Sequence, residues 1–160
     1  MMVVVMGVCG SGKTTIGEAL SRALVWPFRD ADDFHPAANV AKMKAGIPLT
    51  DDDRWPWLDR VVDEMHRVEA AQGNVIVACS ALRQSYRDRL ATAGEVRFVY
   101  LAGDYDTIAA RLAARTHRYM PAALLGSQFA TLEPPADAIV VDIRQSVEQQ
   151  VEAIRGALNA

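Results

Sequence analysis

Apolar and polar positions follow one another along this chain in blocks, rather than alternating residue by residue. Five apolar runs, rich in valine and isoleucine, have the length of short strands. These runs are Val3–Val8, Trp26–Phe28, Val75–Ala78, Val96–Leu101 and Ile139–Val141. Because the runs are continuously apolar, we expect strands that are buried on both faces, as in a parallel sheet.

The segments between the apolar runs have helical periodicity. They are Thr15–Leu24, Pro56–Ala71, Gln84–Ala91, Tyr105–Ala114 and Val147–Leu158. In the last segment Val147, Val151, Ile154 and Leu158 recur at helical spacing, and Ser146 precedes them as an N-cap. Strands that alternate with helices predict an α/β fold with a mainly parallel sheet.

The segment Gly7–Thr14 fits the phosphate-binding pattern G-x-x-x-x-G-K-[ST]. It follows an apolar run and precedes a helical pattern, which is the context that this motif requires. Backbone N–H groups of such a loop bind phosphate oxygens, Lys13 would reach the β- and γ-phosphates, and the Thr14 hydroxyl would ligate Mg²⁺. The alternative is a glycine-rich turn without a ligand. The predicted nucleotide-binding residues of the loop are Gly7, Gly10, Ser11, Gly12, Lys13, Thr14 and Thr15.

Composition narrows the class of protein further. A chain of 160 residues, 51% hydrophobic, is expected to form one domain, residues 1–160. A formal net charge of -3 gives no general attraction to nucleic acid or to anionic membranes. No apolar stretch approaches the ~20 residues of a membrane span, and the N-terminus lacks a basic signal-peptide region. We therefore expect a cytoplasmic protein in which Cys9 and Cys79 act as small apolar side chains.

Two long segments do not fit a minimal core of sheet and helices. The first, about residues 32–57, is rich in Asp, His, Asn, Lys and Pro, and the second, about 115–135, begins with basic residues. Both flank the carboxyl ends of predicted strands, where open α/β sheets bind ligands. Long loops are more often functional than structural. We expect a substrate-binding insert and a mobile lid, respectively.

Acidic residues gather in the insert. Asp30, Asp32 and Asp33 come just after the second predicted strand. One carboxylate there could serve Mg²⁺, and a second could accept the proton of an attacking hydroxyl. The alternative is a solvated acidic turn that caps the next helix. The run Asp51–Asp53 is typical of a helix N-terminus, whereas Arg54 could hold a polar substrate through two hydrogen bonds.

Arginines gather near the lid. Arg111, Arg115 and Arg118 recur at helical spacing and would share one face of a helix. Three such cations suit a clamp on a triphosphate, in which Arg111 and Arg115 bind nucleotide and Arg115 stabilises the transferred phosphoryl group. The alternative is a solvated basic face. Ser80 and Arg83 follow the third strand and are expected at the ligand edge of the sheet.

Together these segments resemble the gluconate kinases, small ATP-dependent sugar-acid kinases related to shikimate kinase. The resemblance spans nearly the whole chain. Beyond the Gly7–Thr14 loop, it rests on Asp30–Pro36 with Asn39, Lys42 and Met43, Gly46–Arg54 with Pro56–Leu58, Cys79–Arg83 with Tyr86–Asp88, and Ser127–Phe129 with Leu132 and Glu133.

The resemblance implies transfer of the γ-phosphoryl group of ATP to the 6-hydroxyl of D-gluconate, which yields the 6-phosphogluconate that feeds the pentose phosphate pathway. It also implies Mg²⁺, a three-layer P-loop kinase fold with strand order 2-3-1-4-5, a closing lid and a homodimer. Asp30 would lie on the metal side and Asp32 would be the base, acting with Lys13 and Arg115. The residues implied to hold the sugar acid are Asp32, His35, Arg54, Arg83 and Gln128.

The chain departs from the family pattern at three places. His117-Arg118-Tyr119 stands where the family shows Gly-His-Phe, Asp142–Ser146 differs near the expected adenine site, and Arg83 replaces a common lysine. Two other functions remain open at this point. One is a kinase of the same fold that acts on another hydroxy acid such as shikimate, and the other is a non-catalytic ATP-binding regulatory module. A nucleic-acid-binding ATPase fits poorly because no basic stripe is present.

Overall fold

The computed structural model describes residues 1–114 and 122–159. Their central feature is a five-stranded sheet in which every neighbouring pair is parallel and the order is β2-β3-β1-β4-β5. The strands are β1 Met2–Met6, β2 Phe28–Asp30, β3 Val75–Ala78, β4 Val96–Ala102 and β5 Ile139–Asp142. The predicted α/β fold and strand order are therefore confirmed.

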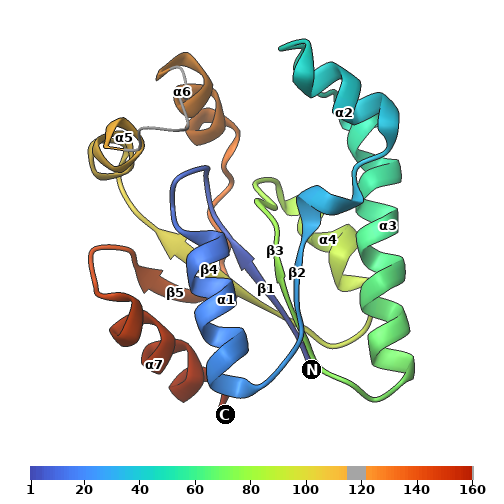
Figure 1. Ribbon diagram of the computed structural model, residues 1–160, viewed down its shortest axis with the longest axis vertical. Helices are drawn as coiled ribbons and strands as arrows, with labels where there is room; N and C mark the ends of the chain where they lie inside the picture. The colour runs from blue at the N-terminus through green and yellow to red at the C-terminus, as the bar shows by residue number, and fades with distance from the viewer. Residues whose placement is uncertain (115–121, 160) are drawn as a thin grey trace.

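Helices cover both faces of this sheet. Figure 1 shows α1 and α7 on one side and α3 and α4 on the other, which gives three layers. The helices are α1 Lys13–Leu24, α2 Ala37–Lys44, α3 Asp51–Ala70, α4 Gln84–Ala91, α5 Tyr105–Ala113, α6 Ala122–Thr131 and α7 Val147–Leu158, with a 3₁₀ turn, η1, at Ala31–Phe34.

The sheet separates the hydrophobic interior into two cores, one on each face, and the central strand β1 contributes side chains to both. Val3 and Val5 pack into the core that contains Leu20 of α1, whereas Met2 and Val4 pack into the core beneath α3 and α4. All five residues of β1 are completely buried. Successive side chains of a strand point to opposite faces, so a strand covered on both faces must be apolar at every position.

The observed boundaries correct several predicted ones. β1 ends at Met6 rather than Val8, because the chain turns into the phosphate loop at Gly7. β2 occupies Phe28–Asp30 rather than Trp26–Phe28, and Asp30 pairs with Ala78 of β3 as its last residue. The preceding residues instead turn out of α1, whose C-cap Val25 is left-handed.

The insert contains more regular structure than the sequence pattern predicts. Helix α2 lies within it, and α3 begins at Asp51, five residues before the predicted start at Pro56. Thr50 and Asp53 form a reciprocal capping box that stabilises this earlier start. The acidic run Asp51–Asp53 is therefore a helix N-terminus, as its sequence predicted.

The carboxyl ends of parallel strands meet at one edge of the sheet, and this edge positions the site. The Gly7–Lys13 loop, η1 and the segment after β3 all begin there. In Figure 1, α6 lies above the loop that joins β1 to α1, and α2 lies above the N-terminal part of α3. No helix within the described ranges is both long enough and apolar enough to cross a membrane.

Candidate active site

The phosphate loop leads directly into the N-terminus of α1. Gly12 precedes the helix with φ 98° and no side chain caps it, so the first backbone N–H groups can donate to a ligand. Gly10 also has a positive φ, 83°, and a Cβ atom there would lie 2.9 Å from Leu112 Cδ2. Both positions therefore favour glycine, and together they form a backbone cradle for an anion.

Lys13 lies against this loop. Its ammonium donates hydrogen bonds to the carbonyl oxygens of Gly7 at 3.1 Å and Val8 at 3.0 Å. Burial lowers the pKa of Lys13, and the nearby carboxylates of Asp32 and Asp30 oppose that shift. An anionic ligand in the cradle would stabilise the ammonium further, because opposite charges favour the ionised form.

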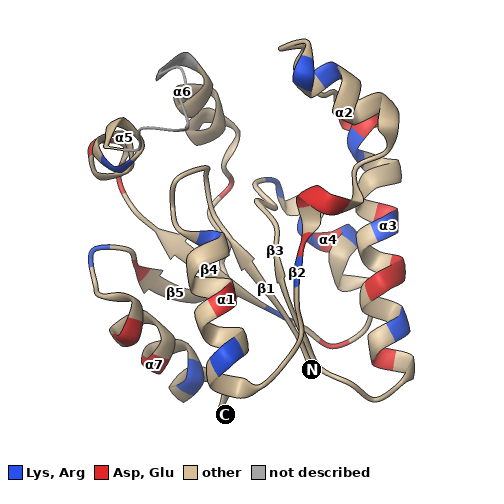
Figure 2. Cartoon of the chain, in the orientation of Figure 1, with Lys and Arg blue, Asp and Glu red and all other residues tan. Residues whose placement is uncertain are grey.

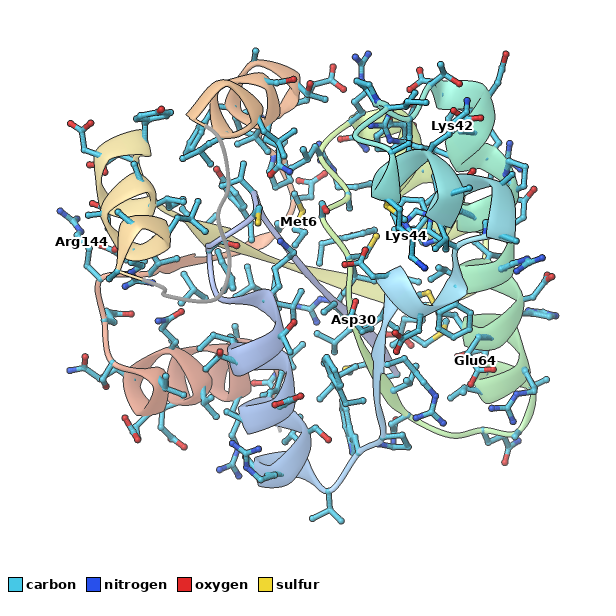
Figure 3. The ribbon with its side chains drawn as sticks, turned by 45° about the horizontal axis from the view of Figure 1, so that its top comes forward. Met6, Asp30, Lys42, Lys44, Glu64 and Arg144 are labelled. Carbon is cyan, nitrogen blue, oxygen red and sulfur yellow. The ribbon has the colours of Figure 1, made fainter. Side chains whose placement is uncertain are left out.

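Thr14 and Asp30 place two oxygen atoms beside the loop. The Thr14 hydroxyl donates to Asp30 Oδ2 at 3.5 Å, and Asp30 Oδ1 accepts the backbone N–H of Asp32 at 3.0 Å. Figure 3 shows Asp30 at the end of β2. A hydroxyl and a carboxylate at this separation fit Mg²⁺, which takes few protein ligands and completes its shell with phosphates and water.

Asp32 and His35 lie together on and just after η1. The Asp32 side chain is largely exposed, whereas only 5% of the His35 side chain is exposed. His35 stacks on Trp57 with ring centroids 4.3 Å apart, and its Nε2 atom lies 3.8 Å from Asp32 Oδ1. Figure 2 shows the acidic residues of η1 as a red segment after β2. This arrangement places the Asp32 carboxylate beside an imidazole whose plane is fixed by Trp57.

The surroundings shift the pKa values of this pair. Partial loss of solvent at the sheet edge raises the pKa of Asp32, and the Asp30 carboxylate adds to the effect. Burial lowers the pKa of His35, assisted by Arg54, while Asp32 opposes the change. A carboxylate with a raised pKa is a better proton acceptor than an ordinary one.

Arg54 is held by two partners before any substrate binds. Its guanidinium donates to the Tyr86 hydroxyl at 3.2 Å and lies 3.5 Å from Asp51 Oδ1. The Tyr86 hydroxyl in turn donates to Asp51 at 2.5 Å. This network fixes the direction of the arginine, as a bidentate clamp on an anion requires.

A cavity of about 440 Å³ opens between these groups and α6. Its lining includes Asp32, His35, Arg54 and Gln128, four of the five residues predicted to hold the acceptor. The Gln128 side-chain oxygen also accepts the backbone N–H of Cys9 at 2.6 Å, which joins α6 to the phosphate loop. The cavity can therefore take a small polar anion next to the phosphate cradle.

The other predicted site residues that the structure describes do not line this cavity. Arg83 is exposed at the N-cap of α4 and does not line this cavity. Arg111 donates to the carbonyl oxygen of Ile143, and Ser11 is buried in the loop while Thr15 is exposed on α1. Arg115, and with it His117 and Arg118, falls outside the described residues.

Sequence reasoning did not assign Asn39, Asp51 or Tyr86 to the site. A buried tyrosine needs a hydrogen-bond partner for its hydroxyl, but its partners Asp51 and Arg54 are 35 and 32 residues away. Asn39 is 3% exposed in α2. The signal that could have found it is its place in the family pattern, together with Asp30–Pro36.

A parallel sheet of this order, with a Gly-Lys-Thr loop at its carboxyl edge, defines a P-loop kinase. The shikimate kinase family model matches residues 9–131. The chain belongs to the gluconokinase family of these kinases. It is 43% identical to the thermosensitive gluconokinase of Escherichia coli K12, over 98% of this chain and 87% of that protein. It is 44% identical to the gluconokinase of Gluconobacter oxydans, over 94% and 85% respectively.

A solved structure agrees with this assignment. The crystal structure of a gluconokinase from Sinorhizobium meliloti has a TM-score of 0.89 and 42% identity, over 99% of this chain and 91% of that one. Shikimate kinase from Aquifex aeolicus shares the fold, with a TM-score of 0.58 at 17% identity. The expected family is thereby confirmed, and membership of the P-loop kinases implies the use of ATP.

Proposed function

We propose that this protein transfers the γ-phosphoryl group of ATP to the 6-hydroxyl of D-gluconate. The observation that carries the proposal is the cavity beside the phosphate loop, which is lined by a carboxylate, Asp32, and a held cation, Arg54. A sugar acid needs both, because its hydroxyl must lose a proton and its own carboxylate calls for a cation. The gluconokinase relatives named above supply the identity of the acceptor.

The phosphate loop forms the nucleotide half of the proposed site. The N–H groups of Gly10, Ser11, Gly12, Lys13, Thr14 and Thr15 would hold the phosphates, with Gly7 shaping the turn. Lys13 would exchange its carbonyl partners for phosphate oxygens, which resemble them as acceptors. Thr14 and Asp30 would hold Mg²⁺ on the metal side. When bound, Mg²⁺ neutralises charge that develops on the phosphates.

Asp32 is the proposed proton acceptor. The substrate oxygen forms a bond to the γ-phosphorus while the bond from phosphorus to the leaving ADP oxygen breaks. The hydroxyl proton passes to the Asp32 carboxylate, and ADP leaves with the electron pair. Lys13 and Arg115 stabilise charge on the transferred group, with Arg111 as a further nucleotide contact.

Arg54, His35, Gln128 and Arg83 are the proposed acceptor-binding residues. Gln128 would contact both the acceptor and the phosphate loop, since it lines the cavity and already accepts a hydrogen bond from Cys9. Segments 32–57 and 115–135 would serve as insert and lid, which exclude water from the reaction. We also propose a cytoplasmic homodimer, supported by the family membership alone. Analytical ultracentrifugation tests the dimer.

A coupled assay of ADP release tests the function. Gluconate, related sugar acids, shikimate and nucleoside monophosphates are compared as acceptors under equal ATP and Mg²⁺. We expect ADP release with gluconate to exceed that with every other acceptor. Release with shikimate but not gluconate would replace this function with the same chemistry on another hydroxy acid. Acceptor-independent or absent release would overturn the transferase assignment.

A further inference from the structure

The side chain of Asn39 lies buried between the candidate active site and the start of α3. Only 3% of this residue is exposed. Its amide nitrogen is 2.9 Å from the carbonyl oxygen of Asp53 and 3.2 Å from Nδ1 of His35. One amide group therefore contacts both the backbone of α3 and the imidazole beside Asp32, the proposed base.

These two contacts determine which atoms donate and which accept, and so which ring nitrogen of His35 carries the proton. A backbone carbonyl oxygen accepts and never donates, so the atom facing Asp53 must be the NH₂ nitrogen of Asn39. That nitrogen carries two hydrogens, and the second is available to His35 Nδ1. Nδ1 must then be the acceptor, which leaves the ring proton of a neutral imidazole on Nε2.

Nε2 is the ring atom that faces the reaction. It lies 3.8 Å from Asp32 Oδ1, and both residues line the acceptor cavity. Arg54 of α3 is the charged group from the opposing element that acts on His35, and it disfavours the imidazolium, as burial does. The stacked Trp57 ring fixes the plane of the imidazole.

We propose that Asn39 is a positioning residue that holds His35 in the neutral Nε2–H tautomer, so that the ring donates toward Asp32 and the acceptor. A protonated Nε2 cannot take a proton from the acceptor hydroxyl. Among the described residues that line the cavity, Asp32 and His35 are the two groups that could act as a base, and of these Asp32 alone is then available. This inference rests on the proposed function for its catalytic meaning, but the tautomer itself does not.

Asn39 is well placed to impose the tautomer because α2 is fastened to α3. Lys42, one turn further along α2, donates to Asp53 Oδ2 at 2.7 Å, and the Thr50 N–H donates to the same oxygen at 2.9 Å. Asp53 thus holds α2 through its carboxylate and orients Asn39 through its carbonyl. Figure 3 shows Lys42 on α2.

Long-range ¹H–¹⁵N correlation spectra of the full chain, labelled with ¹⁵N, test the tautomer directly. At pH 7.5 we expect His35 to show a protonated Nε2 and a bare Nδ1. His66 is an internal reference of the opposite kind, because its Nδ1 lies 3.3 Å from the Ala93 carbonyl and must donate. In Asn39→Asp a carboxylate faces Nδ1, so we expect a proton on Nδ1 of His35 while the His66 signals stay unchanged.

Kinetics of the same variant test the catalytic consequence. We expect Asn39→Asp to lower kcat for gluconate about tenfold or more, with KM for ATP within about twofold of the wild type. A wild-type spectrum with Nδ1–H or imidazolium at His35 would overturn the proposal, whether or not the variant folds. So would an unchanged tautomer in Asn39→Asp. Failure to phosphorylate gluconate would instead overturn the proposed function and leave the tautomer standing.

Discussion

The environment at one edge of the sheet changes the pKa values of two side chains, Asp32 and Lys13. Loss of solvent raises the pKa of Asp32 and lowers that of Lys13. A raised pKa makes the carboxylate a better proton acceptor, and the ammonium is held by the carbonyl oxygens of Gly7 and Val8. At this scale the neighbouring charges and the local solvent access, rather than residue type alone, set the pKa values of these two residues.

Replacing Asp32 by Asn removes the proposed base and nearly preserves its shape. We expect kcat to fall by about 10²–10⁴-fold, the usual contribution of a general base, with ATP binding retained. Steady-state kinetics and calorimetry of ATP binding provide the measurement. Asp33→Asn changes the exposed neighbouring carboxylate and is the matched control. Equal turnover in both variants would exclude Asp32 as the base.

Replacing Lys13 by Ala removes the charge at the phosphate cradle. We expect loss of about 10²-fold or more in kcat/KM, because preorganised charge stabilises the transferred group, with little change in urea midpoint. Lys44→Ala removes an exposed lysine of α2 and should leave both quantities close to wild type. A Lys13→Ala variant with normal kcat/KM would contradict the assignment of the loop.

At the scale of elements, short helices reach the site through their contacts with longer ones. Helix α2 has eight residues, a length that is marginal in isolation, and it is held to α3 by Lys42 and Asn39. Asp53 receives both contacts and also closes the capping box of α3. Stability of the insert and geometry of His35 thus depend on one carboxylate residue.

The Lys42–Asp53 pair has a measurable signature in pH dependence. Hydrogen bonds from Lys42 and Thr50 lower the pKa of Asp53 from 3.8 to about 2. A depressed carboxyl pKa stabilises the fold above the unfolded pKa, and the stabilisation is lost as pH falls through the folded value. In Lys42→Met we expect the Asp53 pKa, followed by NMR titration, to move toward 3.8 and acid unfolding to begin at higher pH. Lys44→Met should change neither, and an unmoved Asp53 would disprove the pair.

At the scale of the whole molecule, two hydrophobic cores fix the sheet that aligns the strand ends. Leu20 of α1 is completely buried in one core, and Leu58 of α3 in the other. The phosphate loop and η1 meet only because β1 and β2 both pair with β3 in parallel. The geometry of the site is therefore a property of sheet packing as much as of its own residues.

Truncating Leu20 to Ala tests that dependence. We expect a loss of about 2–5 kcal/mol in the free energy of unfolding, because a cavity forms beneath α1 in addition to the lost burial. Urea denaturation measures the change. Val140→Ala, at a position 62% exposed on β5, should stay within about 0.5 kcal/mol of the wild type. Similar losses in both variants would contradict this account of the core.

The sequence by itself determined the features that depend on neighbouring residues. Continuous apolar runs correctly predicted the fully buried strands β1 and β3, but the edge strands β2 and β5 are only partly buried because each has a neighbour on one side alone. The glycine-rich turn before α1 could be predicted from the local pattern as well. Asp30 and Asp32 could be proposed as site residues for the same reason, since they lie at the carboxyl end of a strand. The acidic run Asp51–Asp53 correctly predicted a helix N-terminus, but the helical segment was expected to begin only at Pro56, and the capping box of Thr50 and Asp53 shows that α3 begins at Asp51.

Only the tertiary structure decided which side chains meet. Gln128 reaches the phosphate loop across 119 residues of chain, and Arg54 reaches Tyr86 across 32. The same holds for Asn39, whose hydrogen-bonding role depends on how α2 packs against α3. Local propensity carries no information about such contacts, because they arise from the packing of whole elements and the rotamers that this packing permits.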